Sequence, residues 1–267
     1  MKILVCISNV PDTTSKINFT EENSKFDSNG IQFVINPYDE FGLTKAIKLR
    51  EKHGGSVTVV NVGLANTEPT LRKALAIGAD DAIRINAFPN DSFFVANELS
   101  SVAREYDLII TGRESIDYNG GAVPGMLAEI LDLGFVNGCT HLEIEGKSFN
   151  AEREIEGGKE LIEGNLPVII AGQKGIVEES ELLIPNMRGI MTARSKPLNI
   201  KDSQNSDKRT SSVSFEKPEE RAECKLVESG NEKELVNFTD GNFGAQQFLT
   251  NTHFGDFILW RHDDVPS

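Results

Sequence analysis

The chain has 267 residues and a formal net charge of -14 at pH 7, from 27 basic and 41 acidic side chains. This balance leaves no basic face for nucleic acid and argues against binding to anionic membrane surfaces. The three cysteines, Cys6, Cys139 and Cys224, are far apart and form no C-x-x-C pair, so neither a disulfide framework nor a thiolate metal site is expected.

An apolar run, KILVCI, begins directly after Met1. No small-residue cleavage site follows it, and no apolar window of about 18 residues occurs in the chain. We therefore expect a soluble protein in the cytoplasm, a reducing compartment, with no insertion into a membrane.

Strand and helix signals alternate up to residue 132. Four short apolar runs predict buried strands at residues 2–7, 57–62, 82–85 and 107–111. Apolar residues at helical spacing predict helices that begin at Asn36 and Pro37, near Thr67, near Ser92 and near Ala122, with Asn36 as the N-cap of the first helix. Because right-handed crossovers join such units, this order predicts an α/β fold, a parallel sheet with helices on both faces.

A weaker pattern interrupts this alternation between the first strand and the first helix. Residues 16–35 alternate weakly between apolar and polar side chains on both sides of the turn at residues 27–30. This pattern predicts a hairpin excursion around that turn.

Residues 107–132 contain the main candidate for a ligand site. Gly112, Gly120 and Gly121 lie between an apolar run and a helix-like run. Main-chain N–H groups there can approach an anion closely at a helix N-terminus, as in a phosphate-binding loop. A strand-to-helix turn that needs glycine only for its geometry explains the same residues equally well.

Three predicted strands end at the same edge of the sheet. Their ends are Ile7 and Ser8, Val62 and Gly63, and Thr111 and Gly112. In open α/β sheets, ligands bind beyond the carboxyl ends of the strands. We expect the ligand crevice at this edge.

Beyond residue 138 the signals change to strands without helices. Three runs predict an antiparallel excursion that turns at Gly157 and Gly158, and residues 168–171 predict a buried strand. Residues 177–196 are rich in apolar side chains without a regular period, so they fold under the domain or meet a partner.

The remaining residues predict an appendage to this domain. Residues 199–212 are polar and predict a flexible linker. Residues 213–238 cannot bury themselves, so we expect a C-terminal arm that packs on something else. Residues 239–267 have no assignment.

Motifs of several enzyme classes are absent. The sequence contains no G-x-S-x-G, H-E-x-x-H or P-loop pattern, and the first predicted strand is followed by SNVPDTT rather than G-x-G-x-x-G. Serine hydrolases, zincins, P-loop NTPases and NAD-dependent oxidoreductases therefore lose their main support. What remains is a binding protein with no catalytic residue that we can assign.

Residues 151–171, AEREIEGGKELIEGNLPVIIA, form the most specific motif of the chain. A basic residue, an acidic-Gly turn and a later Pro before aliphatic residues resemble the signature of the beta subunit of electron transfer flavoprotein. Further stretches resemble this family in the same order, at residues 35–51, 57–63, 71–83, 112–117 and 188–196. The resemblance implies a fold like the adenine nucleotide alpha-hydrolases over residues 1–198 and a C-terminal arm that embraces an alpha subunit.

The resemblance also implies a cofactor arrangement. The redox FAD lies mostly in the alpha subunit, while the beta subunit holds AMP or, in electron-bifurcating members, a second FAD. The matching nucleotide positions here are Cys6, Asn36, Pro37, Tyr38, Asp39, Val62, Gly112, Arg113, Glu114, Ser115, Ile116, Asp117, Tyr118, Asn119, Gly120, Gly121, Ala122 and Val123. The usual acidic turn with a Gln is replaced by IDYNGGAVPG, which leaves the choice between AMP and FAD open.

A docking loop at about residues 183–196 resembles the segment by which the family contacts acyl-CoA dehydrogenases. Met187 matches its apolar anchor, and Arg188, Ile190 and Met191 accompany it. A flexible thioether suits adaptable partner surfaces, although Met187 filling a gap in the core would explain the same residue.

The leading hypothesis is a non-enzymatic electron carrier subunit. It would accept electrons from flavin dehydrogenases, such as those of fatty acid beta-oxidation, as half of a heterodimer. An ATP-binding regulatory module of the universal-stress type would explain the strand-helix repeat and the Gly turn. It would not explain the motif at residues 151–171 or the arm.

Overall fold

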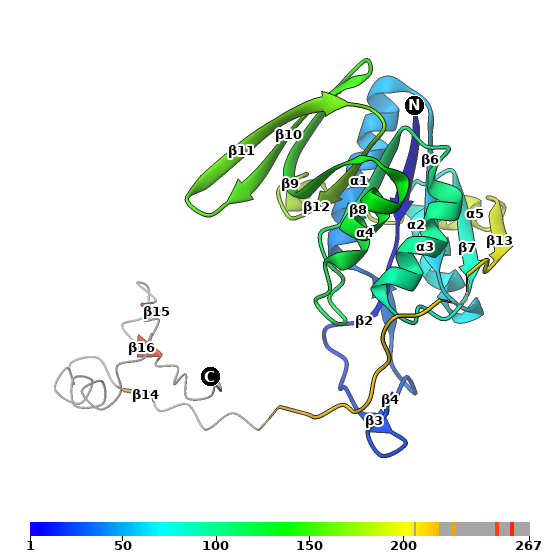
Figure 1. Cartoon of the computed structure of the whole chain (residues 1–267), viewed down its shortest axis with the longest axis vertical. Helices are drawn as coiled ribbons and strands as arrows, with labels where there is room; N and C mark the ends of the chain where they lie inside the picture. The colour runs from blue at the N-terminus through cyan, green and yellow to red at the C-terminus, as the bar shows by residue number, and fades with distance from the viewer. Residues whose placement is uncertain (206, 219–225, 228–248, 251–256, 259–267) are drawn as a thin grey trace. The chain divides into compact units, whose positions relative to one another are not determined.

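A computed structural model describes residues 1–205, 207–218, 226–227, 249–250 and 257–258 (Figure 1). The chain divides into two compact units, Met1–Phe215 and Glu216–Ser267. In the second unit, the described residues form a small antiparallel sheet of β14 (Leu226–Val227), β15 (Leu249–Thr250) and β16 (Phe257–Ile258). The arm and tail predicted at residues 213–267 lie largely outside the described residues.

A nine-stranded sheet forms the centre of the first unit, in the order β11-β10-β9-β12-β8-β1-β6-β7-β13. Neighbouring strands from β9 to β13 in this order are parallel, whereas β10 and β11 are antiparallel to their neighbours. The strands are β1 (Lys2–Cys6), β6 (Ser56–Val62), β7 (Asp81–Asn86), β8 (Leu108–Gly112), β9 (Gly134–Glu145), β10 (Ser148–Ile155), β11 (Gly158–Asn165), β12 (Val168–Gly172) and β13 (Leu198–Asp202). Figure 1 shows β10 and β11 extending beyond the helices.

Helices cover both faces of this sheet, which confirms the predicted α/β fold. They are α1 (Pro37–His53), α2 (Glu68–Ile77), α3 (Ser92–Ala103), α4 (Ala122–Leu131) and α5 (Met187–Ala193), with short turns η1 (Ala65–Thr67) and η2 (Glu179–Glu181). Successive residues of β1 show how the layers form. Ile3 and Val5 join the core under α1 and α2, whereas Leu4 and Cys6 join the core under α3 and α4.

The predicted hairpin is wrong in its position. β3 (Phe19–Thr20) pairs with β4 (Lys25–Phe26), and β2 (Asn9–Pro11) pairs with β5 (Phe33–Ile35). The closing turn therefore lies between β3 and β4 and not at residues 27–30. Glu21, Glu22 and Asn23 adopt positive φ angles of 50°, 55° and 64° there. Nothing in the side chains of the two glutamates signals this conformation, because Gly and Asn are the residues that usually adopt it.

The predicted linker at residues 199–212 also differs from the structure. Its first residues belong to β13, which pairs in parallel with β7 at the edge of the sheet. The next residues bind α3: the buried carboxylate of Glu98 accepts hydrogen bonds from the Ser203 hydroxyl and the Asn205 N–H at 2.9 and 2.8 Å. The linker was predicted because this segment is polar. In the structure, however, its polar groups bind specific partners that lie more than a hundred residues earlier in the sequence.

Two negative findings concern only the described part of the chain. No helix there is long and apolar enough to cross a membrane. No group of three or more His, Cys, Asp or Glu side chains there could hold a metal ion.

Candidate functional site

The candidate site lies where β8, β1 and β6 end side by side. These three strands are neighbours in the sheet, and all run in the same direction. Cys6, Val62 and Gly112 therefore come together at one edge, as the sequence predicted. Burial raises the pKa of the Cys6 thiol, and the nearby Asp39 carboxylate raises it further. The thiol stays protonated and contributes no charge to the crevice.

Asp39 connects the loops that follow β1 and β8. Its side chain is buried, and its two oxygens accept hydrogen bonds from the main-chain N–H groups of Ser8 at 2.7 Å and Gly112 at 2.9 Å. Burial raises the pKa of Asp39 from 3.8 to about 7, although these hydrogen bonds act in the opposite direction. Both oxygens of the side chain therefore accept hydrogen bonds from the protein itself, and these bonds position the two loops.

Asn36 holds the next part of the same loop. It precedes the first residue of α1, but its side chain makes no capping hydrogen bond to that helix. Instead, its Nδ2 donates to the Glu114 carbonyl at 2.9 Å and its Oδ1 accepts from the Ile116 N–H at 3.2 Å. The sequence predicted the position of Asn36 correctly and its partner wrongly, because the loop lies near it only in the folded chain.

Gly112 allows α1 and the loop to approach each other closely. A Cβ atom built at this position would lie 2.4 Å from Asp39 Oδ1 and 2.7 Å from Tyr38 Cβ. Any side chain would therefore displace the start of α1 or the end of β8. The glycine is required here for space, since its φ is not in the left-handed region.

The loop after β8 closes on itself and leads into α4. Ser115 and Gly120 form an antiparallel bridge, and Asn119 adopts a left-handed φ of 50° between them. Gly121 precedes α4, and no side chain caps the first N–H groups of that helix. A helix start without a side-chain cap offers main-chain donors to an anion.

Polar atoms without a hydrogen-bond partner are concentrated at this edge. In the described residues, four buried side-chain atoms lack one: Asn61 Oδ1, Asp81 Oδ1, Thr111 Oγ1 and Ser115 Oγ. Three of the four belong to β6, to β8 or to the loop that follows β8. Buried polar groups usually have partners, so this concentration fits a polar ligand at the strand ends.

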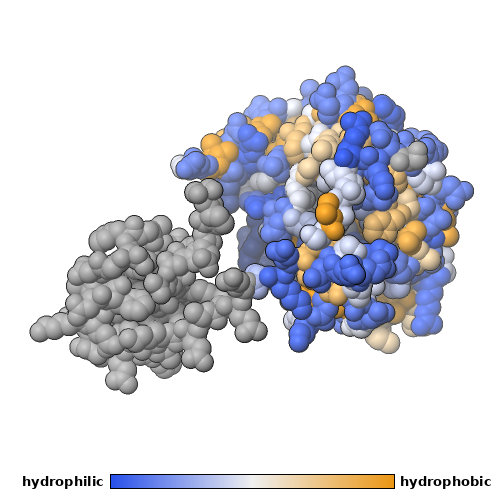
Figure 2. Space-filling view, turned by 60° about the horizontal axis from the view of Figure 1, so that its bottom comes forward, coloured by the Kyte–Doolittle hydropathy of each residue, from blue (hydrophilic) through white to orange (hydrophobic). Residues whose placement is uncertain are grey.

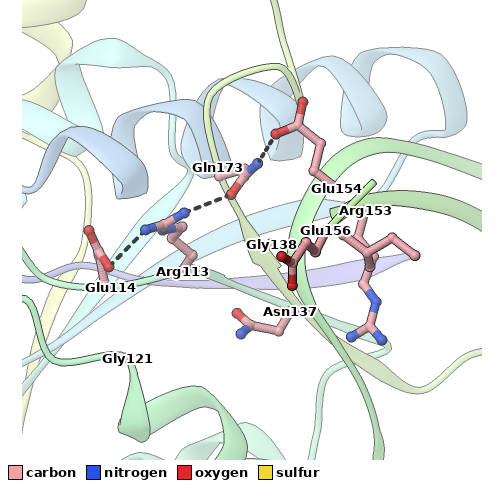
Figure 3. Close-up of a pocket in the computed structure, with 10 residues that line it drawn as sticks. Arg113, Glu114, Gly121, Asn137, Gly138, Arg153, Glu154, Glu156 and Gln173 are labelled. Carbon is pink, nitrogen blue, oxygen red and sulfur yellow. Dashed lines mark hydrogen bonds and ion pairs between the residues drawn. The ribbon is translucent and has the colours of Figure 1, made fainter. Parts of the chain in front are cut away.

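A cavity of about 470 Å³ is lined in part by residues of the same loop. Figure 3 shows a chain of hydrogen bonds along it, in which Arg113 joins Glu114 to Gln173 and Gln173 joins Glu154, each at 3.2 Å. The remaining lining residues are Gly121, Asn137, Gly138, Arg153, Ile155 and Glu156. The cavity thus connects the loop after β8 with the hairpin of β10 and β11, which carries the motif at residues 151–171.

Comparison with known proteins identifies the family. Residues 24–204 match the family model described as electron transfer flavoprotein domain. The protein named electron transfer flavoprotein subunit beta from Bacillus subtilis (strain 168) is 39% identical over 204 residues, which cover 74% of this chain and 77% of that relative. Protein FixA from Azotobacter vinelandii is 36% identical over 190 residues, which cover 67% of each chain. The chain belongs to the electron transfer flavoprotein beta-subunit family.

The other predicted nucleotide positions of this chain differ in exposure. Pro37 is exposed and Tyr38 is half-buried at the start of α1, where the Arg113 guanidinium lies 5.5 Å from the Tyr38 ring centre. Asp117 and Tyr118 are exposed at the tip of the loop, where Tyr118 is 70% exposed. The first residues of α4, Ala122 and Val123, follow the loop directly.

The predicted docking residues lie elsewhere, on α5. Met187, Ile190 and Met191 are 76%, 44% and 69% exposed, and Ile184 just before the helix is 80% exposed. Arg188 is exposed as well. Figure 2 shows that apolar residues interrupt a largely hydrophilic surface on one face of the molecule. Met187 does not fill a gap in the core, which rules out the structural alternative considered for it.

Sequence reasoning missed several residues of the site. Asn61 is buried and donates from Nδ2 to the Ile7 carbonyl at 2.8 Å. The buried Arg84 donates to the Gly63 carbonyl at 3.0 Å and to Asn86 Oδ1 at 2.7 Å. A polar residue within each apolar strand was the available signal, since such residues are buried only with partners.

Proposed function

We propose that this chain is the beta subunit of a heterodimeric electron transfer flavoprotein and that it holds a structural AMP at the carboxyl edge of its sheet. The redox chemistry is supplied by an FAD held mostly by an alpha subunit. The heterodimer carries electrons from flavin dehydrogenases, such as acyl-CoA dehydrogenases, to a downstream acceptor. No residue of this chain takes a catalytic role.

One observation supports this proposal most strongly. Asn36 and Asp39 are buried, and they use four side-chain hydrogen bonds to hold Ser8, Gly112, Glu114 and Ile116. Such rigid support is unnecessary for an ordinary surface turn. It positions the main-chain groups of the loop and the uncapped start of α4, which are suited to a phosphate.

The cavity beside Arg113 favours a second candidate. It is lined by residues of the same loop and of β10, and it has a volume of about 470 Å³. An adenylate on the loop alone would leave this space for a larger ligand. A second FAD bound by this chain, as in an electron-bifurcating subunit, would extend into it.

Counting the ligands tests both candidates. The chain is co-expressed with its alpha subunit, the heterodimer is denatured, and FAD and AMP are quantified by chromatography. One FAD and one AMP per heterodimer is the expected result, whereas two FAD and no AMP would favour the second candidate. A heterodimer without any nucleotide on this chain would overturn both.

A further inference from the structure

The seven-residue helix α5 carries the exposed apolar residues and packs directly on α2. At Gly189, within α5, an added Cβ atom would lie 2.2 Å from the Ala76 carbonyl oxygen of α2. The two backbones are thus so close that any side chain at position 189 would clash with α2. The Asn186 side chain also accepts a hydrogen bond from the Gly189 N–H at 2.7 Å, which fixes the start of α5.

Reciprocal hydrogen bonds join the ends of the two helices. Arg72 on α2 donates from one nitrogen, Nη1, to the carbonyls of Ala193 and Lys196, both at 2.8 Å. Lys196 donates in return from Nζ to the carbonyls of Leu75 and Ala79 at 2.9 and 2.5 Å. Carbonyl groups at or just beyond the C-terminal end of each helix therefore accept hydrogen bonds from a cationic side chain of the other segment.

The segment before α5 is attached to α1. The Leu183 N–H donates to Thr44 Oγ1 at 3.2 Å, and Lys48 pairs with Glu181 at 2.8 Å. Leu182 and Leu183 pack against the core. The apolar segment is thus held at both ends, although it has no regular pattern in the sequence.

We infer that Arg72, Gly189 and Lys196 are positioning residues, which hold the docking surface of Met187, Ile190 and Met191 in a fixed arrangement before a partner binds. This inference rests on the proposed function and on the docking role that the family resemblance implies for residues 183–196. It also removes Lys196 from the charges offered to a partner, because its ammonium group is used inside the protein. Arg188 and Arg194, which are exposed, remain as the cations of this surface.

Limited trypsin digestion of the purified full-length chain tests the positioning. Trypsin cleaves after Arg188 and Arg194, but not after Lys196, because Pro197 follows it. Arg72→Met removes two hydrogen bonds to α5 and is expected to raise the cleavage rate at both sites about tenfold or more. Arg72→Lys should restore much of the protection, because one ammonium can replace the single nitrogen that makes both bonds.

Gly189→Ala gives an independent test, because here alanine is expected to destabilise a helix that it would normally stabilise. Alanine in place of a helical glycine normally stabilises a helix by about 1 kcal/mol. At Gly189 the contact with Ala76 should reverse this effect and raise the cleavage rate about tenfold. The matched control is Gly125→Ala in α4, where the nearest atom to the added Cβ, from Phe135, lies at 3.6 Å. This control, and Arg104→Met just after α3 for loss of one exposed cation, should cleave within about twofold of the wild type.

Electron transfer to the heterodimer from a short-chain acyl-CoA dehydrogenase reduced with butyryl-CoA tests the link to docking. Arg72→Met and Gly189→Ala should raise KM for the heterodimer about tenfold and leave kcat within about twofold. Wild-type cleavage rates in both variants would overturn the positioning role. Faster cleavage with an unchanged KM would support the positioning of α5 and overturn its docking function. A variant that lost its bound flavin or its cooperative unfolding would be replaced by Lys196→Met, for which the same results are expected.

Discussion

The loop after β8 and the segment around α5 are built in opposite ways. The loop presents main-chain groups and is held by polar side chains that are themselves buried, Asn36 and Asp39. The α5 segment presents apolar side chains and is held by bonds to main-chain carbonyls, from Arg72 and Lys196. In both regions, the groups offered outward differ from the groups that fix their position.

This difference indicates how each region responds to substitution. Removing one partner of a buried hydrogen bond lowers the free energy of unfolding substantially, because no water molecule can replace the lost partner. Replacing an exposed apolar side chain changes the free energy of unfolding little, because the side chain is already in contact with water. We therefore expect large stability effects at the loop and small ones at α5, with binding effects at both.

Gly112→Ala should show the largest effect at the loop. The added methyl group would lie 2.4 Å from Asp39 Oδ1, so α1 and β8 must move apart, at a cost of about 1–3 kcal/mol. Chemical denaturation and the AMP content of the heterodimer provide the measurements. Gly158→Ala is the matched control, because nothing lies within 4 Å of its added Cβ. Equal stability and AMP content in both variants would contradict the close approach.

Asn36→Ala should be next in size. It leaves the Glu114 carbonyl and the Ile116 N–H without their partner. Both hydrogen bonds are only partly buried, so water can replace part of each, and the two losses together should cost about 1–2 kcal/mol. AMP retention during gel filtration should fall with stability. Asn90→Ala removes an exposed hydrogen bond to Phe88 and should change the free energy of unfolding by less than about 0.5 kcal/mol. Similar losses in the two variants would count against a special role for Asn36.

Asp39 should make stability depend on pH. Its pKa in the folded chain is about 7, above the ordinary 3.8, so between these values the folded chain binds more protons than the unfolded chain. The contribution of this group to the free energy of unfolding therefore falls as pH rises from about 4 to about 7, at up to about 1.4 kcal/mol per pH unit.

Asp39→Asn cannot ionise and should lack this slope, although one of the two N–H groups that face the carboxylate loses its acceptor. Urea denaturation at several pH values, with the exposed Glu51→Gln on the same helix as control, measures the difference. A wild type and Asp39→Asn with parallel pH profiles would refute the assignment.

Met187→Asp should have the smallest effect on stability and a clear effect on docking. Its side chain is 76% exposed, so the free energy of unfolding should change by less than about 0.5 kcal/mol. A charge at the centre of an apolar contact should raise KM for a partner dehydrogenase about tenfold. Leu161→Asp on β11, at an apolar position that is 74% exposed, is the control and should leave KM unchanged. An unchanged KM for Met187→Asp would place docking on a different surface.

Much of the fold and part of the site could be predicted from the sequence. The β-branched run of β6 and the Asn-Pro start of α1 are local signals, and the structure has a strand and a helix there. The strand at β13 was missed because its pairing with β7 involves residues over a hundred positions apart. The role of Asn36 was misread for the same reason: a local rule assigned it to its own helix, and the folded chain brings it a loop 78 residues away.

The sequence by itself determined the alternation of strands and helices, the glycine turn after β8 and the membership of a family, because these depend on local pattern and on residue identity. Only the tertiary structure decided that Asp39 joins two loops, that Gly189 allows α5 to contact α2, and that Lys196 is unavailable to a partner. These hydrogen bonds and close backbone contacts join residues that are far apart in the sequence. The local sequence around each residue therefore does not predict them.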